Sequence, residues 1–138
     1  MAERDYSHVP LARKLGIGAG ARVSLIGAPD GVRALLGDLP EGVDIATRAR
    51  AGTDVAVLFR THARGLAPAF ARIAGTLTPA GGLWVAWPKR SSGVATDVDF
   101  DLVQRTGLAA GRVDNKVCSI DSTWTAIRFV LRRRDRTA

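Results

Sequence analysis

The 138-residue sequence contains one cysteine, two histidines and no long hydrophobic run. A single cysteine excludes an intrachain disulfide, which makes a cytoplasmic location the default expectation. No apolar stretch approaches the ~20 residues that span a bilayer, so we expect no membrane segment and no membrane partner. The opening residues MAERDYSHVP are partly acidic and lack the apolar core of a secretory signal.

Residues that bind metals or act as nucleophiles are also scarce. His8, His62 and Cys118 are far apart in the sequence, so nothing has the spacing of a metal site. No Gly-x-Ser-x-Gly motif marks a nucleophilic serine. Cys118 lies in an apolar strand pattern, which favours a small buried side chain over a nucleophile. The sequence therefore predicts no metal site, no catalytic residue and no cofactor.

The charge is strongly one-sided: 20 lysines and arginines stand against 13 acidic residues, a formal net charge of +7. Such a balance can attract nucleic acid, nucleotides or anionic surfaces. Residues 133–138 form a basic tail, and the other arginines are scattered along the chain. Because no nucleic-acid recognition motif is present, we expect nucleic-acid binding that is weak and non-specific at most.

What the sequence does contain is an alternation of strand and helix patterns. Residues 66–77 carry apolar side chains at helical spacing. The glycines of the following Thr78–Gly82 segment predict a turn with positive φ, and the wholly apolar run 83–87 predicts a strand buried on both faces. The other patterns predict strands over residues 22–26, 43–47, 54–59, 112–120 and 123–132, and helices over 11–15, 29–39 and 97–106, the last ended by Gly107.

This order predicts one three-layer α/β domain over residues 22–132, after a lead-in over residues 1–21. We expect a mostly parallel sheet of about six strands with helices on both faces, closed by an antiparallel hairpin strand. Only about six residues connect the strands 43–47 and 54–59, whereas a parallel crossover normally needs a dozen or more. The segment 43–47 is therefore either a very short edge strand or an antiparallel one.

Polar and aromatic residues on these elements have structural interpretations. Asp97, Asp99 and Asp101 alternate with apolar residues at a predicted helix start, where negative charge is favourable. The three tryptophans could stack on nucleic-acid bases, but all lie on predicted strands in apolar surroundings. Core packing is therefore the favoured interpretation of Trp84, Trp87 and Trp124.

The element order and the helix–Pro-x-Gly-Gly–strand unit resemble class I methyltransferases over about residues 22–132, with one helix–strand–helix unit missing. This resemblance implies a shortened Rossmann-like fold. A closer resemblance, spread over nearly the whole chain, is to a small bacterial family of unknown function, and it implies the fold but no activity. The shared motifs are PLARKLGI (10–17), Ala28-Pro29, LPEGV (39–43), LWVAWPK (83–89), SGVATD (92–97) and KVCSID (116–121) followed by Trp124.

The residues that bind S-adenosylmethionine in such a fold are not at their expected places. The stretch Gly16–Gly20 looks like a nucleotide-binding motif but precedes the first strand, whereas the motif must follow it. We interpret it as a flexible entry turn. The loop after that strand has Pro29 between its glycines, and Thr47 and Arg48 stand where the second strand should end in a carboxylate. We therefore expect no appreciable S-adenosylmethionine binding.

One candidate ligand site lies at the carboxyl edge of the predicted sheet, where open α/β sheets bind ligands. The loops after the first, third and fourth strands meet there beside a helix N-terminus, which favours anions. The alternative is that these are ordinary solvated loop residues. Because exposed charges usually contribute within ~0.5 kcal/mol, replacing Lys89 and Arg90 by alanine should leave folding almost unchanged. The residues, named here the basic rim, are Pro29, Asp30, Arg60, His62, Lys89 and Arg90.

The sequence thus favours a non-catalytic, methyltransferase-like module that binds a protein or an anionic small molecule. Two alternatives stay open: a small-molecule or nucleotide-binding enzyme that uses the carboxyl edge, and a weak, sequence-independent nucleic-acid binder. A homo-oligomer is compatible with all three. Fold alone does not choose among them.

Overall fold

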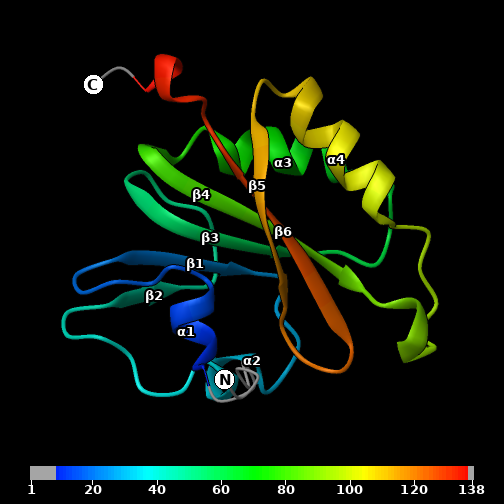
Figure 1. The fold of residues 1–138 in the computed structure, drawn as a ribbon, viewed down its shortest axis with the longest axis horizontal. Coiled ribbons are helices and arrows are strands. Elements are labelled where there is room, and N and C mark those ends of the chain that lie inside the picture. The colour runs from blue at the N-terminus through cyan, green and yellow to red at the C-terminus, as the bar shows by residue number, and fades with distance from the viewer. Residues whose placement is uncertain (1–8, 137–138) are drawn as a thin grey trace, which may run out of the picture.

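The computed structural model describes residues 9–136. Its centre is a six-stranded sheet in the order β2-β1-β3-β4-β6-β5. Strands β1 to β4 run parallel, and β6 runs antiparallel to both of its neighbours (Figure 1). The predicted sheet, mostly parallel with a terminal antiparallel hairpin, is confirmed. The strands are β1 (Arg22–Ile26), β2 (Asp44–Ala46), β3 (Thr53–Phe59), β4 (Leu77–Pro88), β5 (Val113–Ser119) and β6 (Trp124–Val130).

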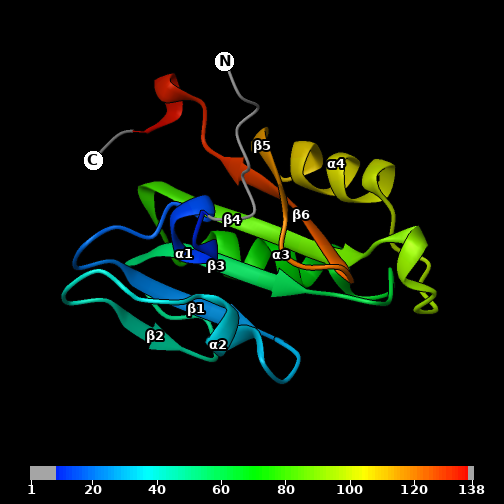
Figure 2. The same ribbon diagram turned by 60° about the horizontal axis from the view of Figure 1, so that its bottom comes forward.

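Helices cover both faces of the sheet and complete three layers (Figures 1 and 2). Apolar residues of α1 (Leu11–Lys14) and α2 (Val32–Leu35) pack on one face, and those of α3 (Leu66–Ala74) and α4 (Phe100–Ala109) on the other. The 3-10 turns η2 (Arg90–Ser92) and η3 (Arg133–Asp135) follow β4 and β6. No helix within residues 9–136 is long and apolar enough to cross a membrane.

The lead-in segment is part of the core. Leu15 and Ile17 are buried against the sheet. The indole Nε1 of Trp84 donates a hydrogen bond to the Leu15 carbonyl at 3.0 Å. Trp84 and Trp87 are buried, and Trp124 packs edge-on against Phe59 with ring centroids 5.2 Å apart. The interpretation of the tryptophans as core residues is confirmed. Residues 1–8, with His8, and residues 137–138 lie outside the described part of the chain.

Two helix predictions were wrong in their extent. The helix predicted over residues 29–39 is the single turn Val32–Leu35, because Gly31 and Gly37 stand on either side at φ 88° and 75°. The helix predicted to end at Gly107 continues to Ala109. A Cβ at position 107 would lie 2.1 Å from Cε1 of Phe129. The close packing of α4 on β6 therefore requires a glycine here.

The turn predicted at residues 78–82 is present, although the assigned strand β4 spans Leu77–Pro88. The pairing with β3 jumps from Thr53–Leu77 to Val55–Gly82, and a Cβ at Gly81 would lie 3.0 Å from the Thr78 carbonyl oxygen three residues earlier. The positive φ expected there is wrong. Neither Gly81 nor Gly82 has a positive φ. A Cβ at Gly81 would lie 3.0 Å from the Thr53 carbonyl oxygen, and one at Gly82 would lie 2.4 Å from Nε of Arg128. These glycines therefore allow close approach within the sheet at the turn, without the positive φ that sequence predicted.

The open question about residues 43–47 has a clear answer: β2 is a short edge strand parallel to β1, with Asp44 beside Arg22. Residues 47–52 then connect β2 to β3, which pairs with the opposite side of β1. This crossover is about half the usual minimum length. A segment this short has no room for a helix, so polar side chains must hold it on the sheet.

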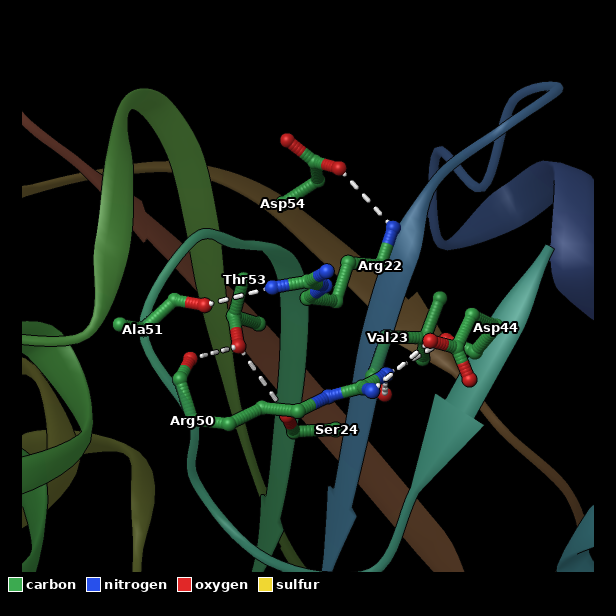
Figure 3. A network of polar contacts seen from close by, with 8 residues as sticks. All are labelled: Arg22, Val23, Ser24, Asp44, Arg50, Ala51, Thr53 and Asp54. Atoms are coloured by element: carbon green, nitrogen blue, oxygen red, sulfur yellow. Dashed lines mark hydrogen bonds and ion pairs between the residues drawn. The ribbon is translucent and has the colours of Figure 1, made fainter.

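Arg50 supplies most of that attachment (Figure 3). Its Nη1 lies 2.8 Å from Oδ2 of Asp44, and its Nη2 donates to the carbonyl oxygens of Asp44 at 2.9 Å and Val23 at 3.3 Å. The hydroxyl of Thr53 donates to the Arg50 carbonyl at 2.5 Å and lies 3.2 Å from the buried hydroxyl of Ser24. One side chain therefore joins the crossover to both β1 and β2.

We predict that Arg50→Met lowers the free energy of unfolding by about 2 kcal/mol. The exposed ion pair with Asp44 contributes little, but the bonds to two backbone carbonyls are charge-assisted and would leave acceptors unpaired. Urea titration monitored by tryptophan fluorescence measures the change. Arg48→Met, at an exposed position of the same crossover, is the matched control and should be neutral. Equal stability of the two variants would contradict this role.

Candidate functional site

The carboxyl ends of β1, β3 and β4 lie side by side at one edge of the sheet (Figure 1). Pro29 and Asp30 follow β1, Arg60 and His62 follow β3, and Lys89 and Arg90 follow β4. The predicted grouping of these loops follows from the strand order. Only Pro29, Asp30 and Arg90 of the rim line hollows at this edge, and they fall in two separate ones.

The first, named here the β1 hollow, has a volume of about 370 Å³. Pro29 and Asp30 line it, together with Arg33 and Thr47. The second, the β4 hollow, has a volume of about 530 Å³ and contains only Arg90 of the rim. Its lining residues are Trp87, Pro88, Arg90, Thr96, Asp97, Val98, Asp99, Phe100 and Asp101.

Lys89 does not offer a free charge at this edge. Its Nζ donates to the hydroxyl of Ser119 and to the carbonyl of Asp121, both at 2.6 Å. Its backbone N–H donates to the Thr123 carbonyl at 2.7 Å. Lys89 therefore fastens the turn between β5 and β6 to the end of β4. Those partners lie about 30 residues further along the chain, which argues against the expectation that removing Lys89 leaves folding unchanged.

Arg60 likewise binds within its own loop. Its guanidinium donates to the Arg64 carbonyl, and its Nε is buried with no partner in the described structure. His62, two residues on, is exposed. The helix N-terminus expected beside these residues is that of the four-residue α2, too short to build up an appreciable macrodipole. Arg90 is thus the exposed rim cation beside a hollow, and residues 9–136 hold no hydrogen-bond partner for its side chain.

Three carboxylates stand opposite Arg90, so the β4 hollow is mixed in charge, where sequence analysis expected a basic one. Each carboxylate has a structural contact. Oδ1 of Asp97 accepts the Ala63 N–H at 2.7 Å, and Oδ1 of Asp99 accepts the Leu102 N–H at 2.9 Å. Oδ2 of Asp101 pairs with Arg105 at 2.9 Å. The interpretation as helix-start residues is confirmed for Asp99, the N-cap of α4, and for Asp101 in its first turn. Asp97 lies before the helix and holds the loop after β3.

The hollow also has an aromatic wall, which sequence analysis missed. Trp87 and Phe100 meet edge to face with centroids 6.3 Å apart. Trp87 is buried, whereas Phe100 is 45% exposed. Phe100 is the one aromatic residue among the exposed large hydrophobic side chains of residues 9–136. The signal in the sequence was Phe100 itself, the one aromatic residue within an acidic helix start.

Other reactive groups are not arranged for chemistry. Within residues 9–136, no group of three or more His, Cys, Asp or Glu side chains is close enough to hold a metal ion. Cys118 is buried. Burial raises the pKa of its thiol, and the positive charges of Lys14 and Lys89 only partly oppose this. The reactive thiolate is therefore disfavoured.

Comparison with solved structures identifies the fold. An S-adenosylmethionine-dependent methyltransferase from Aquifex aeolicus superposes with a TM-score of 0.58 at 12% identity, over 91% of this chain and 93% of that one. The Methanococcus jannaschii fibrillarin pre-rRNA processing protein gives 0.56 at 14% identity, over 88% and 73%. The mitomycin 7-O-methyltransferase MmcR gives 0.55 at 12% identity over 81% of this chain, which spans about half, 49%, of that enzyme.

The fold is therefore that of the class I methyltransferases, in a shortened form. No family model and no curated protein sequence matches the chain. At these identities the likeness establishes the architecture, and the function has to be argued from the residues themselves.

The residues at the cofactor position do not fit S-adenosylmethionine. β2 ends at Ala46 and is followed by Thr47 and Arg48, so no carboxylate is there to bind a ribose. The carboxylate of β2, Asp44, lies at its amino end and pairs with Arg50. In the loop after β1, Pro29 lines the hollow, and a proline has no N–H to offer a ligand.

We predict that Lys89→Ala and Arg90→Ala, adjacent in sequence, differ in stability. Lys89→Ala should cost about 1–2 kcal/mol, because two charge-assisted hydrogen bonds to the β5–β6 turn are lost. Arg90→Ala should stay within ~0.5 kcal/mol. Thermal unfolding of both variants measures the difference. A neutral Lys89→Ala variant would show that the turn does not depend on this ammonium group.

Proposed function

We propose that the chain is a non-catalytic binding module with a methyltransferase-like fold, and that its ligand binds in the β4 hollow. The observation that carries this proposal is the coincidence of an exposed aromatic ring, an unengaged arginine and a hollow of about 530 Å³. All three occur at the sheet edge where ligands of open α/β folds bind. A cytoplasmic location and membership of a small bacterial family remain part of the proposal.

The charges of the hollow restrict the ligand. Arg90 can pair with a carboxylate or a similar single negative charge. Asp97, Asp99 and Asp101 stand nearby and repel a polyanion. Trp87 and Phe100 supply apolar and aromatic surface for a flat ring. The arrangement therefore favours a small aromatic monoanion as the ligand. Arg90 is then the one member of the basic rim that contacts the negative charge of this ligand.

A binding role is favoured over an enzyme because no nucleophile, carboxylate pair with a free acid–base role or metal cluster joins these residues. The aspartate contacts described above leave Asp97 and Asp99 holding backbone N–H groups and Asp101 paired with Arg105. An enzyme acting at the same edge remains the alternative, and detected turnover of any ligand would favour it over this proposal.

The proposal predicts that benzoate and indole acetate bind in the β4 hollow and that benzylamine, of similar shape but opposite charge, does not. Arg90→Ala should weaken benzoate about tenfold, through loss of a charge-assisted contact. Phe100→Ala should weaken all ring-bearing ligands. NMR titration of the backbone amides of residues 96–101 locates the site and measures the affinity.

Arg72→Ala, an exposed arginine on α3, is the control for charge loss and should leave benzoate binding unchanged. If benzylamine binds more tightly than benzoate, the aspartates define the site and the proposed ligand class is wrong. If neither binds near Phe100, the site itself is wrong.

We further predict that S-adenosylmethionine and its demethylated product do not stabilise the protein. A ligand at a hundred times its dissociation constant raises the free energy of unfolding by ~2.7 kcal/mol, which calorimetry detects readily. The absent ribose carboxylate and the Pro29 loop motivate this expectation. A clear binding isotherm for either compound would contradict it.

A further inference from the structure

A second kind of site lies at the opposite, amino edge of the parallel strands. The loop between α1 and β1, the start of β4 and the Arg128 side chain of β6 surround a hollow of about 340 Å³. Figure 1 shows the loop and the start of β4 at the same edge, away from the carboxyl ends. This amino-edge hollow contains the stretch Gly16–Gly20, which the sequence showed as a misplaced nucleotide-binding pattern.

Arg128 is an unusual cation. A Cβ at Gly82 would lie 2.4 Å from its Nε, so the side chain crosses the sheet exactly where β4 has no side chain of its own. It is half-buried, and residues 9–136 provide its guanidinium with neither a hydrogen-bond acceptor nor an ion pair. Burial lowers its pKa, and the like charge of Arg136 lowers it further. None of the Arg128 nitrogens is among the buried, unpartnered atoms of residues 9–136, so its donors are accessible at the hollow, where an anion can reach them.

The loop opposite Arg128 is held in place. Leu15 and Ile17 are buried, and the Leu15 carbonyl accepts the Trp84 indole N–H. Gly16 and Gly20 have positive φ values of 82° and 73°, which explains both glycines. These contacts present residues 18 and 19 on a rigid support at the hollow.

The glycine at position 18 is not explained by a positive φ or by close packing. Its φ is not positive, and an added Cβ would meet nothing within 4 Å. The backbone N–H groups of Gly18 and Ala19 donate to no acceptor in the described part of the chain, and both residues line the hollow. A residue without a side chain, next to free N–H donors, is what close approach of a ligand to the backbone requires.

We propose that the amino-edge hollow binds a phosphate group, between the Arg128 guanidinium and the backbone of Gly18 and Ala19. A forked guanidinium and neighbouring N–H donors match the several oxygens of phosphate. Asp54 also lines the hollow, where its Oδ2 accepts the Arg22 backbone N–H at 2.9 Å and its Oδ1 the Thr78 hydroxyl at 3.3 Å. Its charge opposes the phosphate, so the attraction has to come from Arg128 and the free N–H donors. The phosphate belongs either to a small molecule or to a nucleic-acid backbone.

Pyrophosphate and a single-stranded oligonucleotide are the probes, titrated into the full chain at constant ionic strength. Arg128→Gln and Gly18→Leu should each weaken pyrophosphate binding about tenfold or more, because one removes the charged donors and the other covers the backbone. Gly18→Leu should not change the melting temperature, since its Cβ has open space and an ordinary φ. The Gly18→Leu variant therefore tests phosphate binding in the amino-edge hollow even if Arg128→Gln impairs folding.

Arg72→Gln and Ala67→Leu, both exposed on α3, are the matched controls and should bind pyrophosphate like the unchanged protein. Loss of oligonucleotide binding in the two test variants would assign the phosphate to nucleic acid, and loss of pyrophosphate binding alone would assign it to a small molecule. The proposal is overturned if neither probe binds, or if both test variants bind as the unchanged protein does. It is also overturned if Arg90→Ala weakens pyrophosphate equally, which would move the phosphate to the carboxyl edge.

Discussion

The guanidinium of Arg50 connects three segments: the crossover of residues 47–52, the edge strand β2 and the first parallel strand β1. Arg22 of β1 adds a second attachment, because its Nη1 donates to the Ala51 carbonyl at 3.0 Å. A parallel connection usually contains a helix whose apolar face holds it on the sheet. Here hydrogen bonds from these arginine side chains replace that face, and the hydroxyls of Thr53 and Ser24 complete the attachment beneath it. The sheet order β2-β1-β3 depends on this arrangement.

The short crossover has consequences at the carboxyl edge. The carboxylate of β2 is used to hold Arg50 at the amino end of the strand, and the end that would face a cofactor carries Thr47 and Arg48. The carboxylate of β2 therefore has a structural contact in this chain. At the carboxyl edge of the sheet, the exposed arginine and aromatic ring lie beside β4, where Arg90 and Phe100 border a hollow.

The two edges of the sheet differ in what they offer a ligand. At the carboxyl edge, aromatic surface and carboxylates accompany Arg90, whose side chain has no hydrogen-bond partner within residues 9–136. At the amino edge, Arg128 faces glycine backbone and free N–H donors. The first combination suits a flat molecule with a single charge, and the second suits the compact, multiply charged phosphate group. One small domain therefore presents two chemically different surfaces, separated by the length of its strands.

Local patterns in the sequence were sufficient for the layer architecture, the antiparallel hairpin and the strands β1, β3 and the buried half of β4, because runs of apolar residues leave few alternatives. They also placed the rim loops at one edge, since the ends of parallel strands meet there. They placed a turn at residues 78–82 but missed why Gly81, Gly82 and Gly107 are glycines, because Thr53, Arg128 and Phe129 pack against these positions from other strands. They failed again at Lys89, whose partners come from the β5–β6 turn. Composition and periodicity thus determined which segments are buried, whereas the tertiary structure alone decided which charges are free and which glycines face a ligand, because those properties depend on neighbours that are distant in the chain.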